Sequence, residues 1–231
     1  MPRTVLITGA SRGLGLKLAA GMAGRGDTVF GCGRSEAPAD APFRYIEADV
    51  RDEKSVAALF SGLRKEADGL DALINNAGLA GAKPLLLSRG EDFDGIFAAN
   101  VTGAAIVTRE AAKMMKRGGG AIINVSSIHV PLASVGSGAY GASKAALEQL
   151  SRVFAHELAG YSISVNSLGL SYVEGTGMAE AQSKKAIDAV SARLARPGLI
   201  TADEVLHAVD FLISPAARNI TGQTIYFGGP L

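Results

Sequence analysis

The chain has one cysteine, Cys32, no tryptophan, and only 6% aromatic residues among its 231 positions. A single cysteine excludes an intrachain disulfide and a thiolate metal cluster, and three scattered histidines lack the spacing of metal ligands. We therefore expect no metal site. The scarcity of aromatic rings is also atypical of a surface on which nucleic-acid bases stack.

A strong charge of either sign is absent too, because 23 Lys and Arg residues nearly balance 22 Asp and Glu residues. Nucleic-acid-binding proteins usually carry a clear basic excess. No apolar run reaches the length of a transmembrane helix, and the opening "MPRTVLITGA" is interrupted too early for a signal peptide. We expect a cytoplasmic protein with neither a nucleic-acid nor a membrane partner.

What the chain does contain is an alternation of short apolar runs with helical patterns. Strands are expected at 4–10, 27–33, 43–50, 70–78, 120–127, 163–169 and 223–229. Helices are expected at 13–26, 55–68, 92–117, 141–160 and 202–213. Strands that are apolar on both faces and separated by helices indicate a parallel sheet that helices cover on both sides. The sequence therefore predicts an α/β fold with a doubly wound parallel sheet of about seven strands.

Residues 170–200 form the only long stretch without an expected element, and they include "EGTG" and "RPG". A long loop inside a compact domain is usually functional. No linker or change in composition divides the chain. We therefore predict a single domain over residues 1–231, with a substrate lid at about 170–200 that is mobile without a ligand.

A glycine-rich turn, "TGASRGLG" at 8–15, joins the first strand to the first helix. Glycine allows a sharp turn and a close approach of the backbone to a phosphate, and the helix N-terminus offers free N–H groups. The spacing, Gly9-x3-Gly13-x-Gly15, differs from the common GxGxxG. Glycines also serve ordinary strand-to-helix turns, so this motif alone indicates phosphate binding only weakly.

The end of the second strand carries Gly33 and Arg34 where an acidic residue would normally bind the adenosine 2′-hydroxyl. Arg12, in the glycine turn, is expected nearby. Two guanidinium groups without a carboxylate suit a 2′-phosphate, although Glu36 could compete and both arginines could be surface residues. Asp49, after the third strand, is placed either to bind the adenine amino group or to cap the next helix.

Tyr140 and Lys144 lie one helical turn apart in "SGAYGASK", among small residues. On one helix face, a nearby ammonium favours the phenolate, so Tyr140 could exchange a proton with a substrate. Taken alone, such a pair is more often a buried tyrosine with a satisfied hydroxyl beside a solvated lysine. Ser127 ends the fifth strand, at the sheet edge where ligands bind, and Asn100 is a poor helix former inside an expected helix.

Taken together, these motifs resemble the short-chain dehydrogenase/reductase family, and most of all its β-ketoacyl-acyl-carrier-protein reductases. The matching segments span residues 8 to 229 in the family's order: "TGASRGLG", "ADV", "NNAG", Asn100, "NVSS", "YGASK", "SVNSLG" and "ITGQTIYFGG". The resemblance implies a Rossmann-type fold and a nicotinamide cofactor. It also implies a homo-oligomer, either a tetramer or a dimer.

By this resemblance, Tyr140 is the general acid/base, Ser127 orients the carbonyl, Lys144 binds the nicotinamide ribose, and Asn100 holds a water of the proton relay. The implied cofactor-binding residues are Gly9, Ser11, Arg12, Gly13, Leu14, Gly15, Arg34, Asp49, Val50, Asn76, Ala77, Gly78, Tyr140, Lys144 and Val173. One departure is Leu170-Ser171, which stands where the family usually has Pro-Gly. Thr176 also comes one residue later than the family's carboxamide-binding threonine.

The sequence therefore predicts an NADP(H)-dependent oxidoreductase acting on a carbonyl or a secondary alcohol. Its substrate would be a small molecule, free or bound to a carrier, with a 3-oxoacyl thioester as one candidate. Two alternatives stay open: an NAD-linked dehydrogenase of a sugar, steroid or polyol, and a cofactor-binding protein without turnover.

Overall fold

The structure, a computed structural model, describes residues 2–230. Seven parallel strands form one sheet in the order β3-β2-β1-β4-β5-β6-β7, which confirms the predicted doubly wound sheet. The strands are β1 (Thr4–Thr8), β2 (Thr28–Gly33), β3 (Arg44–Glu47), β4 (Ala72–Asn75), β5 (Gly120–Ser127), β6 (Ile163–Leu170) and β7 (Thr224–Tyr226).

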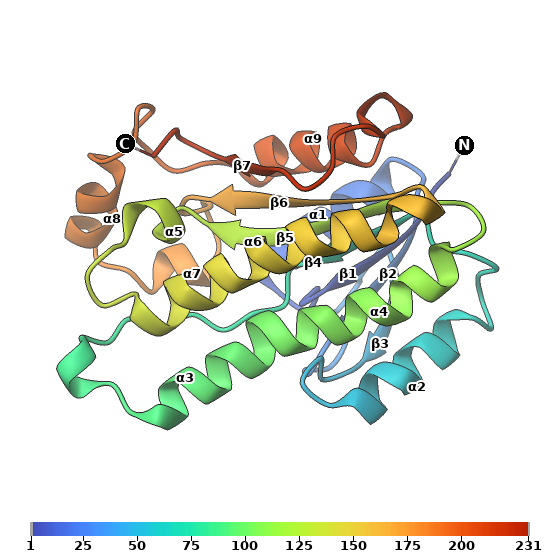
Figure 1. Cartoon of the computed structure of the whole chain (residues 1–231), viewed down its shortest axis with the longest axis horizontal. Helices are drawn as coiled ribbons and strands as arrows, with labels where there is room; N and C mark the ends of the chain where they lie inside the picture. The colour runs from blue at the N-terminus through green and yellow to red at the C-terminus, as the bar shows by residue number, and fades with distance from the viewer. Residues whose placement is uncertain (1, 231) are drawn as a thin grey trace.

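Helices lie on both faces of this sheet (Figure 1). The longer ones are α1 (Gly13–Gly24), α2 (Glu53–Leu63), α3 (Gly90–Phe97), α4 (Ala104–Met115), α6 (Gly138–Leu158) and α9 (Ala202–Leu212). Helices α2, α4 and α6 pack on one face, and α1 and α9 pack on the other. Strand β1 shows why both faces need cover, because Leu6 points to the first face while Val5 and Ile7 point to the second, and all three are fully buried.

The strand order places a crevice at one edge of the sheet. From β1 the chain runs outward to β2 and β3, and then returns to β4 on the other side of β1. Loops that leave the carboxyl ends of β1 and β4 therefore diverge, and ligands of doubly wound sheets bind at this switch point. The glycine turn after β1 and "NNAG" after β4 both lie there.

The connection between β2 and β3 is unusual, because residues 34–43 contain no helix. Parallel strands are usually joined by a crossover helix that covers one face of the sheet. Here the half-buried rings of Phe43 and Tyr45 pack against the core cluster on the α1 face. A Cβ added to Gly31 would lie only 2.6 Å from the Phe43 ring, so the absent side chain lets this ring lie against the sheet.

Two stretches differ in detail from the sequence prediction. The helix expected at 92–117 is a continuous run of α3, a π-helical turn η2 (Ala98–Gly103) and α4. The stretch expected to lack elements contains two helices, α7 (Gly177–Glu180) and α8 (Lys184–Ser191). Its ends are fixed by bridges from Val173 to Ile200 and from Leu194 to Pro230. The remaining short helices are η1 (Leu85–Leu87), α5 (His129–Leu132), η3 (Ala159–Tyr161) and η4 (Pro215–Ala217).

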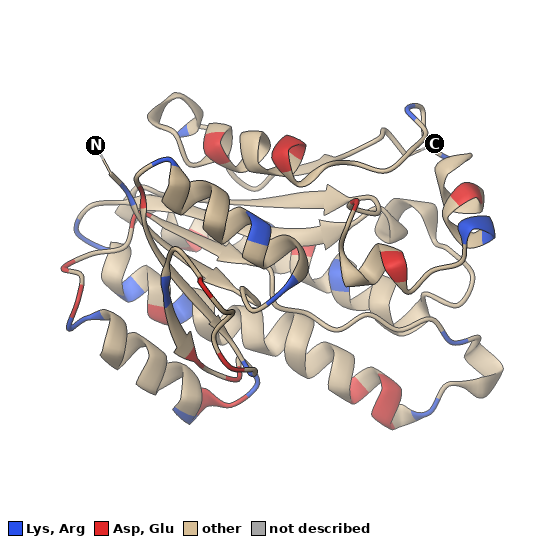
Figure 2. Cartoon of the chain, turned by 180° about the vertical axis from the view of Figure 1, so that it is seen from behind, with Lys and Arg blue, Asp and Glu red and all other residues tan. Residues whose placement is uncertain are grey.

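Charged residues are distributed over the molecule with both signs interspersed, as Figure 2 shows from the side opposite to Figure 1. None of the helices in residues 2–230 is long and apolar enough to cross a membrane. Over the same residues, no group of three or more His, Cys, Asp or Glu side chains could hold a metal ion.

Candidate active site

The glycine turn after β1 has backbone geometry that only glycine adopts easily. Gly9 and Gly13 have φ angles of +69° and +58°. A Cβ on Gly15 would lie 2.2 Å from the Gly9 carbonyl oxygen, so a side chain there would push the turn open. Arg12 precedes α1 without a side-chain cap, which leaves the first N–H groups of the helix available to a phosphate.

Residues after β4 hold this turn in place. Asn76 Nδ2 donates to the carbonyl oxygens of Thr8 (3.0 Å) and Gly9 (3.2 Å). In return, the Thr8 hydroxyl accepts hydrogen bonds from the backbone N–H groups of Asn76 and Ala77. The Asn76 side chain therefore fixes the two loops that diverge at the crevice. A phosphate cradle of this kind fits the pyrophosphate of a dinucleotide.

The adenosine end of the crevice carries two exposed arginines. Gly33, Ser11 and the Tyr45 hydroxyl lie together, because a Cβ on Gly33 would be 2.7 Å from Tyr45 Oη and 3.3 Å from Ser11 Oγ. Arg12 and Arg34 flank this place. Within residues 2–230, neither guanidinium forms an ion pair, whereas Arg51 does.

Asp49 is occupied by Arg51, whose Nη2 lies 2.6 Å from a carboxylate oxygen. This guanidinium holds the pKa of Asp49 below its usual range. The interpretation of Asp49 as a helix cap is wrong, because Asp52 accepts the capping bond from the Lys54 N–H of α2. Val50 is buried beside Gly103, where an added Cβ would lie 2.9 Å from the Val50 side chain.

The chemical end of the crevice is formed by the end of β5 and the first turns of α6. Ser127, Tyr140 and Lys144 are all buried, with 4%, 7% and 4% of their surface exposed. Lys144 Nζ donates to the Val125 carbonyl oxygen at 2.7 Å and lies 5.9 Å from the centre of the Tyr140 ring. The structure thus brings the three residues together, as the spacing on one helix face requires.

Asn100 joins this group from the π-helical turn. Its side-chain oxygen accepts from the Leu79 N–H (2.7 Å), and its Nδ2 donates to the Leu79 carbonyl oxygen and to Ser143 Oγ, each at 2.9 Å. Ser143 in turn donates to the Tyr140 carbonyl oxygen. Gly78 leaves room for this contact, because a Cβ there would lie 2.9 Å from Asn100 Oδ1. π-Helical turns inside α-helices are frequent at functional sites.

Burial has the largest effect on the pKa values of Tyr140 and Lys144. It raises the pKa of the Tyr140 phenol, while the nearby Ser127 hydroxyl opposes this effect. This direction is opposite to the one expected from Lys144 alone, because burial has the largest effect on the phenol. The ammonium donates to the Val125 carbonyl oxygen. Burial also lowers the pKa of Lys144 to about 8. At neutral pH the site therefore holds a neutral phenol, which suits a proton donor.

His129, two residues after Ser127, lies beside the phenol. Its ring packs edge-on against Tyr140 (6.0 Å between centroids) and Tyr172 (6.1 Å). Its Nδ1 is hydrogen-bonded to Ser134 Oγ. Burial and the charge of Arg193 lower the pKa of His129, so the ring is neutral at pH 7.

The segment after β6 reaches the glycine turn through Thr176, which comes one residue later than the family's carboxamide-binding threonine. The Thr176 side chain is buried and lies 3.9 Å from the position of a Cβ on Gly13. Its hydroxyl donates to the Val173 carbonyl oxygen. Val173 itself packs in the core on the α1 face, and Leu170 lengthens β6 and is buried in the same core. Thr176 therefore approaches the phosphate cradle, while the Val173 side chain points into the core.

Comparison with known proteins supports the class of protein that this fold and site define. The family model described as enoyl-(acyl carrier protein) reductase matches residues 9–229. The 3-oxoacyl-(acyl-carrier-protein) reductase of Vibrio cholerae serotype O1 is 32% identical over 98% of this chain and 96% of its own length. A short-chain type dehydrogenase/reductase of Picea abies is also 32% identical, over 98% of this chain and 91% of its own.

A solved structure agrees with the fold. The structure of a short-chain type dehydrogenase/reductase from Mycobacterium ulcerans superposes with a TM-score of 0.89 at 27% identity and covers 99% of this chain and 92% of its own. The chain belongs to the short-chain dehydrogenase/reductase family. Its members are oxidoreductases that act on CH–OH groups, and membership implies a nicotinamide cofactor.

Three residues around the site have roles that were not predicted from the sequence. Ser143 links Asn100 to the Tyr140 carbonyl, and its place between Tyr140 and Lys144 was a usable signal. Glu148 and Tyr226 form a partly buried hydrogen bond across 78 positions of the chain, from α6 to β7. No local pattern could have indicated that contact.

Proposed function

We propose that the protein is an NADP(H)-dependent reductase that converts a carbonyl to a secondary alcohol, with Asn100, Ser127, Tyr140 and Lys144 as its catalytic group. One observation supports this most strongly. A buried phenol, a serine hydroxyl and a lysine lie together at the carboxyl end of β5, and the glycine turn after β1 has a backbone geometry that suits a phosphate. Burying a polar group costs free energy unless it is hydrogen-bonded, and groups with shifted pKa values cluster at functional sites.

The proposed reaction divides the work between the cofactor and the side chains. A bound nicotinamide supplies the hydride that adds to the carbonyl carbon. Ser127 donates a hydrogen bond to the carbonyl oxygen and holds it near the Tyr140 phenol. The phenol O–H gives its proton to that oxygen as negative charge develops, so the product is an alcohol and a phenolate remains. The Lys144 ammonium stabilises this phenolate until a proton returns through a water that Asn100 would hold.

NADPH is the proposed form of the cofactor because Arg12 and Arg34 are exposed beside Gly33 and carry no ion pair with a carboxylate of residues 2–230. A 2′-phosphate would supply the missing anion and bind a guanidinium bidentately. The pyrophosphate would lie on the turn of Gly9, Gly13 and Gly15, and Thr176 would approach it from the other side.

The proposed substrate class is a 3-oxoacyl thioester, free or bound to a carrier protein. This proposal relies on the likeness to the Vibrio reductase over nearly the whole of both chains. We further propose that residues 170–200 form a lid over the substrate and that the protein assembles as a homotetramer or homodimer. Light scattering of the purified protein would measure the assembly.

The decisive experiment follows the absorbance of the reduced nicotinamide with NADPH or NADH and a panel of 3-oxoacyl thioesters and simple ketones. The proposal predicts consumption of NADPH with at least one 3-oxoacyl thioester. The reverse assay offers NAD⁺ with sugars, steroids and polyols, and turnover confined to that panel would favour the NAD-linked alternative. Tight NADPH binding without turnover on any compound would indicate a cofactor-binding protein.

A further inference from the structure

A buried carboxylate lies one turn beyond Lys144 on the same helix. Glu148 and Lys144 are each 4% exposed. The Glu148 carboxylate accepts hydrogen bonds from Ser126 Oγ (2.5 Å) and from the Tyr226 hydroxyl (2.7 Å). Within residues 2–230, it forms no ion pair with a lysine, arginine or histidine closer than 4.0 Å. A buried carboxylate without a direct ion pair is costly, so its presence needs a reason.

The position of Glu148 is set by the register of α6 against β5. Tyr140, Lys144 and Glu148 follow at intervals of four, which aligns them on one face of the helix. Lys144 is bonded to the Val125 carbonyl oxygen, and Glu148 is bonded to the side chain of the next residue, Ser126. The carboxylate and the ammonium are therefore bonded to adjacent residues of one strand.

The contact with Tyr226 shows that this place is built for a polar group. The tyrosine ring, on β7, crosses β6 where Gly169 lacks a side chain, and a Cβ there would lie 2.1 Å from the ring. Because the ring crosses β6 at this glycine, its hydroxyl reaches Glu148 on α6. An apolar residue at position 148 would leave the Ser126 and Tyr226 hydroxyls without the acceptor they share.

We propose that Glu148 is a positioning residue whose buried negative charge keeps Lys144 protonated next to the reacting phenol. This inference rests on the proposed function. It gives the carboxylate a task that a neutral hydrogen-bonding side chain could not perform. Two charges in a poorly hydrated site interact more strongly than they would in water, even without direct contact.

The direction of the effect follows from the two opposing influences on Lys144. Burial lowers its pKa to about 8, and the charge of Glu148 is the influence that raises it. Without the carboxylate, the ammonium would lose its proton at a lower pH. The neutral amine could no longer stabilise a phenolate at Tyr140.

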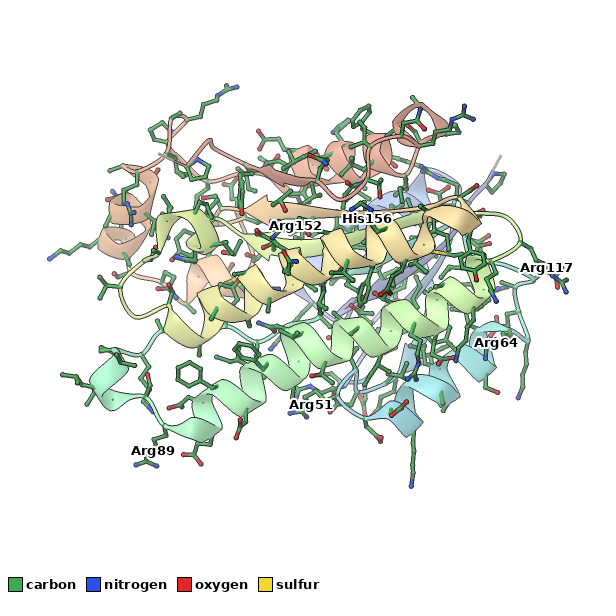
Figure 3. The ribbon with its side chains drawn as sticks, viewed as in Figure 1. Arg51, Arg64, Arg89, Arg117, Arg152 and His156 are labelled. Carbon is green, nitrogen blue, oxygen red and sulfur yellow. The ribbon has the colours of Figure 1, made fainter. Side chains whose placement is uncertain are left out.

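Few other titratable groups face this pair, so the assignment is testable. On α6 these are Tyr140 and Arg152, the latter labelled in Figure 3. Tyr226 faces Glu148 from β7, and the carboxylate together with burial raises the pKa of that phenol. His129 and Tyr172 lie beyond the Tyr140 ring. The strand residues bonded to the pair, Val125 and Ser126, do not titrate.

The test measures the titration of Lys144 directly, by NMR of the protein labelled with ¹³C at the lysine ε-carbons and assigned with Lys144→Met. Lys144 is the only buried lysine among residues 2–230, so its titration should separate from the others. Glu148→Gln keeps the size and hydrogen-bonding ability of the side chain and removes its charge. We expect this variant to lower the Lys144 titration midpoint by about one pH unit. Glu148→Asn, which also removes the charge and keeps an amide oxygen as acceptor, should do the same and serves if the glutamine variant does not fold.

Tyr226→Phe is the matched control, because it removes a partly buried hydrogen bond to Glu148 but leaves the carboxylate. Its Lys144 midpoint should stay within a few tenths of a unit of the parent value. In the charge-removing variants, kcat should fall about tenfold relative to the parent near pH 9 and stay within about twofold near pH 6.

An unchanged midpoint in both charge-removing variants would overturn the proposal. So would an equal shift in Tyr226→Phe, because a purely structural role would then explain the data. If the parent reduces no ketone, the proposed function fails, yet the NMR titration still decides the role of Glu148.

Discussion

The two ends of the crevice are built on opposite principles. At the chemical end, Asn100, Lys144 and Glu148 are buried and each is hydrogen-bonded within the chain. At the dinucleotide end, Arg12 and Arg34 are exposed, and neither pairs with a carboxylate of residues 2–230. The connection from β2 to β3 contains no helix. Groups that move protons must be held before the substrate arrives, whereas exposed charges can stay free at little cost until an anion binds.

The largest effect should come from deleting one oxygen at the buried end. Tyr140→Phe keeps the ring and its contact with His129 and removes only the transferable proton. We expect kcat to fall by about 10²-fold or more, the scale of general acid–base catalysis, while the NADPH dissociation constant stays within about twofold of the parent value. Steady-state rates and a fluorescence titration measure the two quantities.

Tyr172→Phe is the matched control, because the Tyr172 ring also packs edge-on against His129 at nearly the same distance. Its turnover should stay within a few-fold of the parent. Equal losses in the two variants would mean that the pocket needs hydroxyl groups in general and that Tyr140 is not the specific proton donor.

The next effect tests the open end. If Arg12 and Arg34 bind a 2′-phosphate, the parent should bind NADPH more tightly than NADH by about 1–3 kcal/mol. Replacing both arginines with alanine should remove that preference and leave NADH binding nearly unchanged. Arg51→Ala is a suitable control, since Asp49 already neutralises that guanidinium. A parent that binds the two cofactors equally would contradict the two-arginine argument.

A smaller effect should show how tightly the chemical end is packed. In Gly169→Ala, the new methyl group would meet the Tyr226 ring at 2.1 Å, so the ring must move and its bond to Glu148 must weaken. We expect a loss of about 1–3 kcal/mol in the free energy of unfolding. In Gly24→Ala, at the C-terminal end of α1 and away from the crevice, the new methyl group would have no neighbour within 4 Å, so this variant should not destabilise the fold. Urea denaturation compares them, and equal stability would show that β7 is loosely held.

Sequence patterns predicted most of what is local in this molecule. The doubly wound parallel sheet follows from strands with two apolar faces that alternate with helices. At the chemical end, Ser127 could be placed because it ends an expected strand, and Tyr140 and Lys144 because they lie one helical turn apart. Asn100 was singled out as a poor helix former, and the structure has a π-helical turn at that point. The glycine turn was recognised because its backbone geometry excludes other residues.

What escaped prediction depends on contacts between distant segments. The packing of the Phe43 ring against Gly31 and the Glu148–Tyr226 hydrogen bond each join elements that share no motif. The Tyr140 pKa is raised by burial, which the spacing along a helix does not reveal. Leu170 lies beyond the expected end of the sixth strand, yet it is a buried residue of β6.

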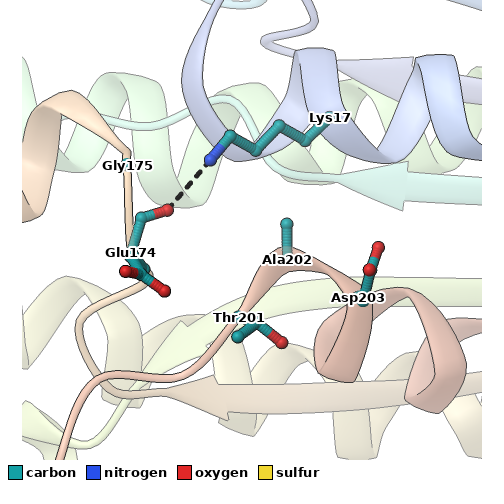
Figure 4. Close-up of a pocket in the computed structure, with 6 residues that line it drawn as sticks. All are labelled: Lys17, Glu174, Gly175, Thr201, Ala202 and Asp203. Carbon is teal, nitrogen blue, oxygen red and sulfur yellow. Dashed lines mark hydrogen bonds between the residues drawn. The ribbon is translucent and has the colours of Figure 1, made fainter.

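The smallest effect should come from the contact that ties the segment after β6 to α1. Lys17 Nζ donates to the Glu174 carbonyl oxygen at 2.9 Å, across a depression of about 400 Å³ (Figure 4). The neighbouring Gly175 has a φ of +61°, and a Cβ there would lie 2.8 Å from Lys17 Nζ. Because this hydrogen bond is exposed, its loss in Lys17→Ala should weaken NADPH binding by only about threefold.

The same variant should make residues 171–195 easier to cleave by a protease in the absence of NADPH, because one anchor of that segment has been removed while Thr176 keeps its place near Gly13. NADPH should restore protection in both the parent and the variant. Lys184→Ala is the control, since its partner Asp188 lies on the same exposed helix α8 and neither residue reaches α1. Cleavage that ignores NADPH in every protein would mean that the segment is a rigid part of the fold. Within the dinucleotide end, only the two arginines would then stay free until the cofactor binds.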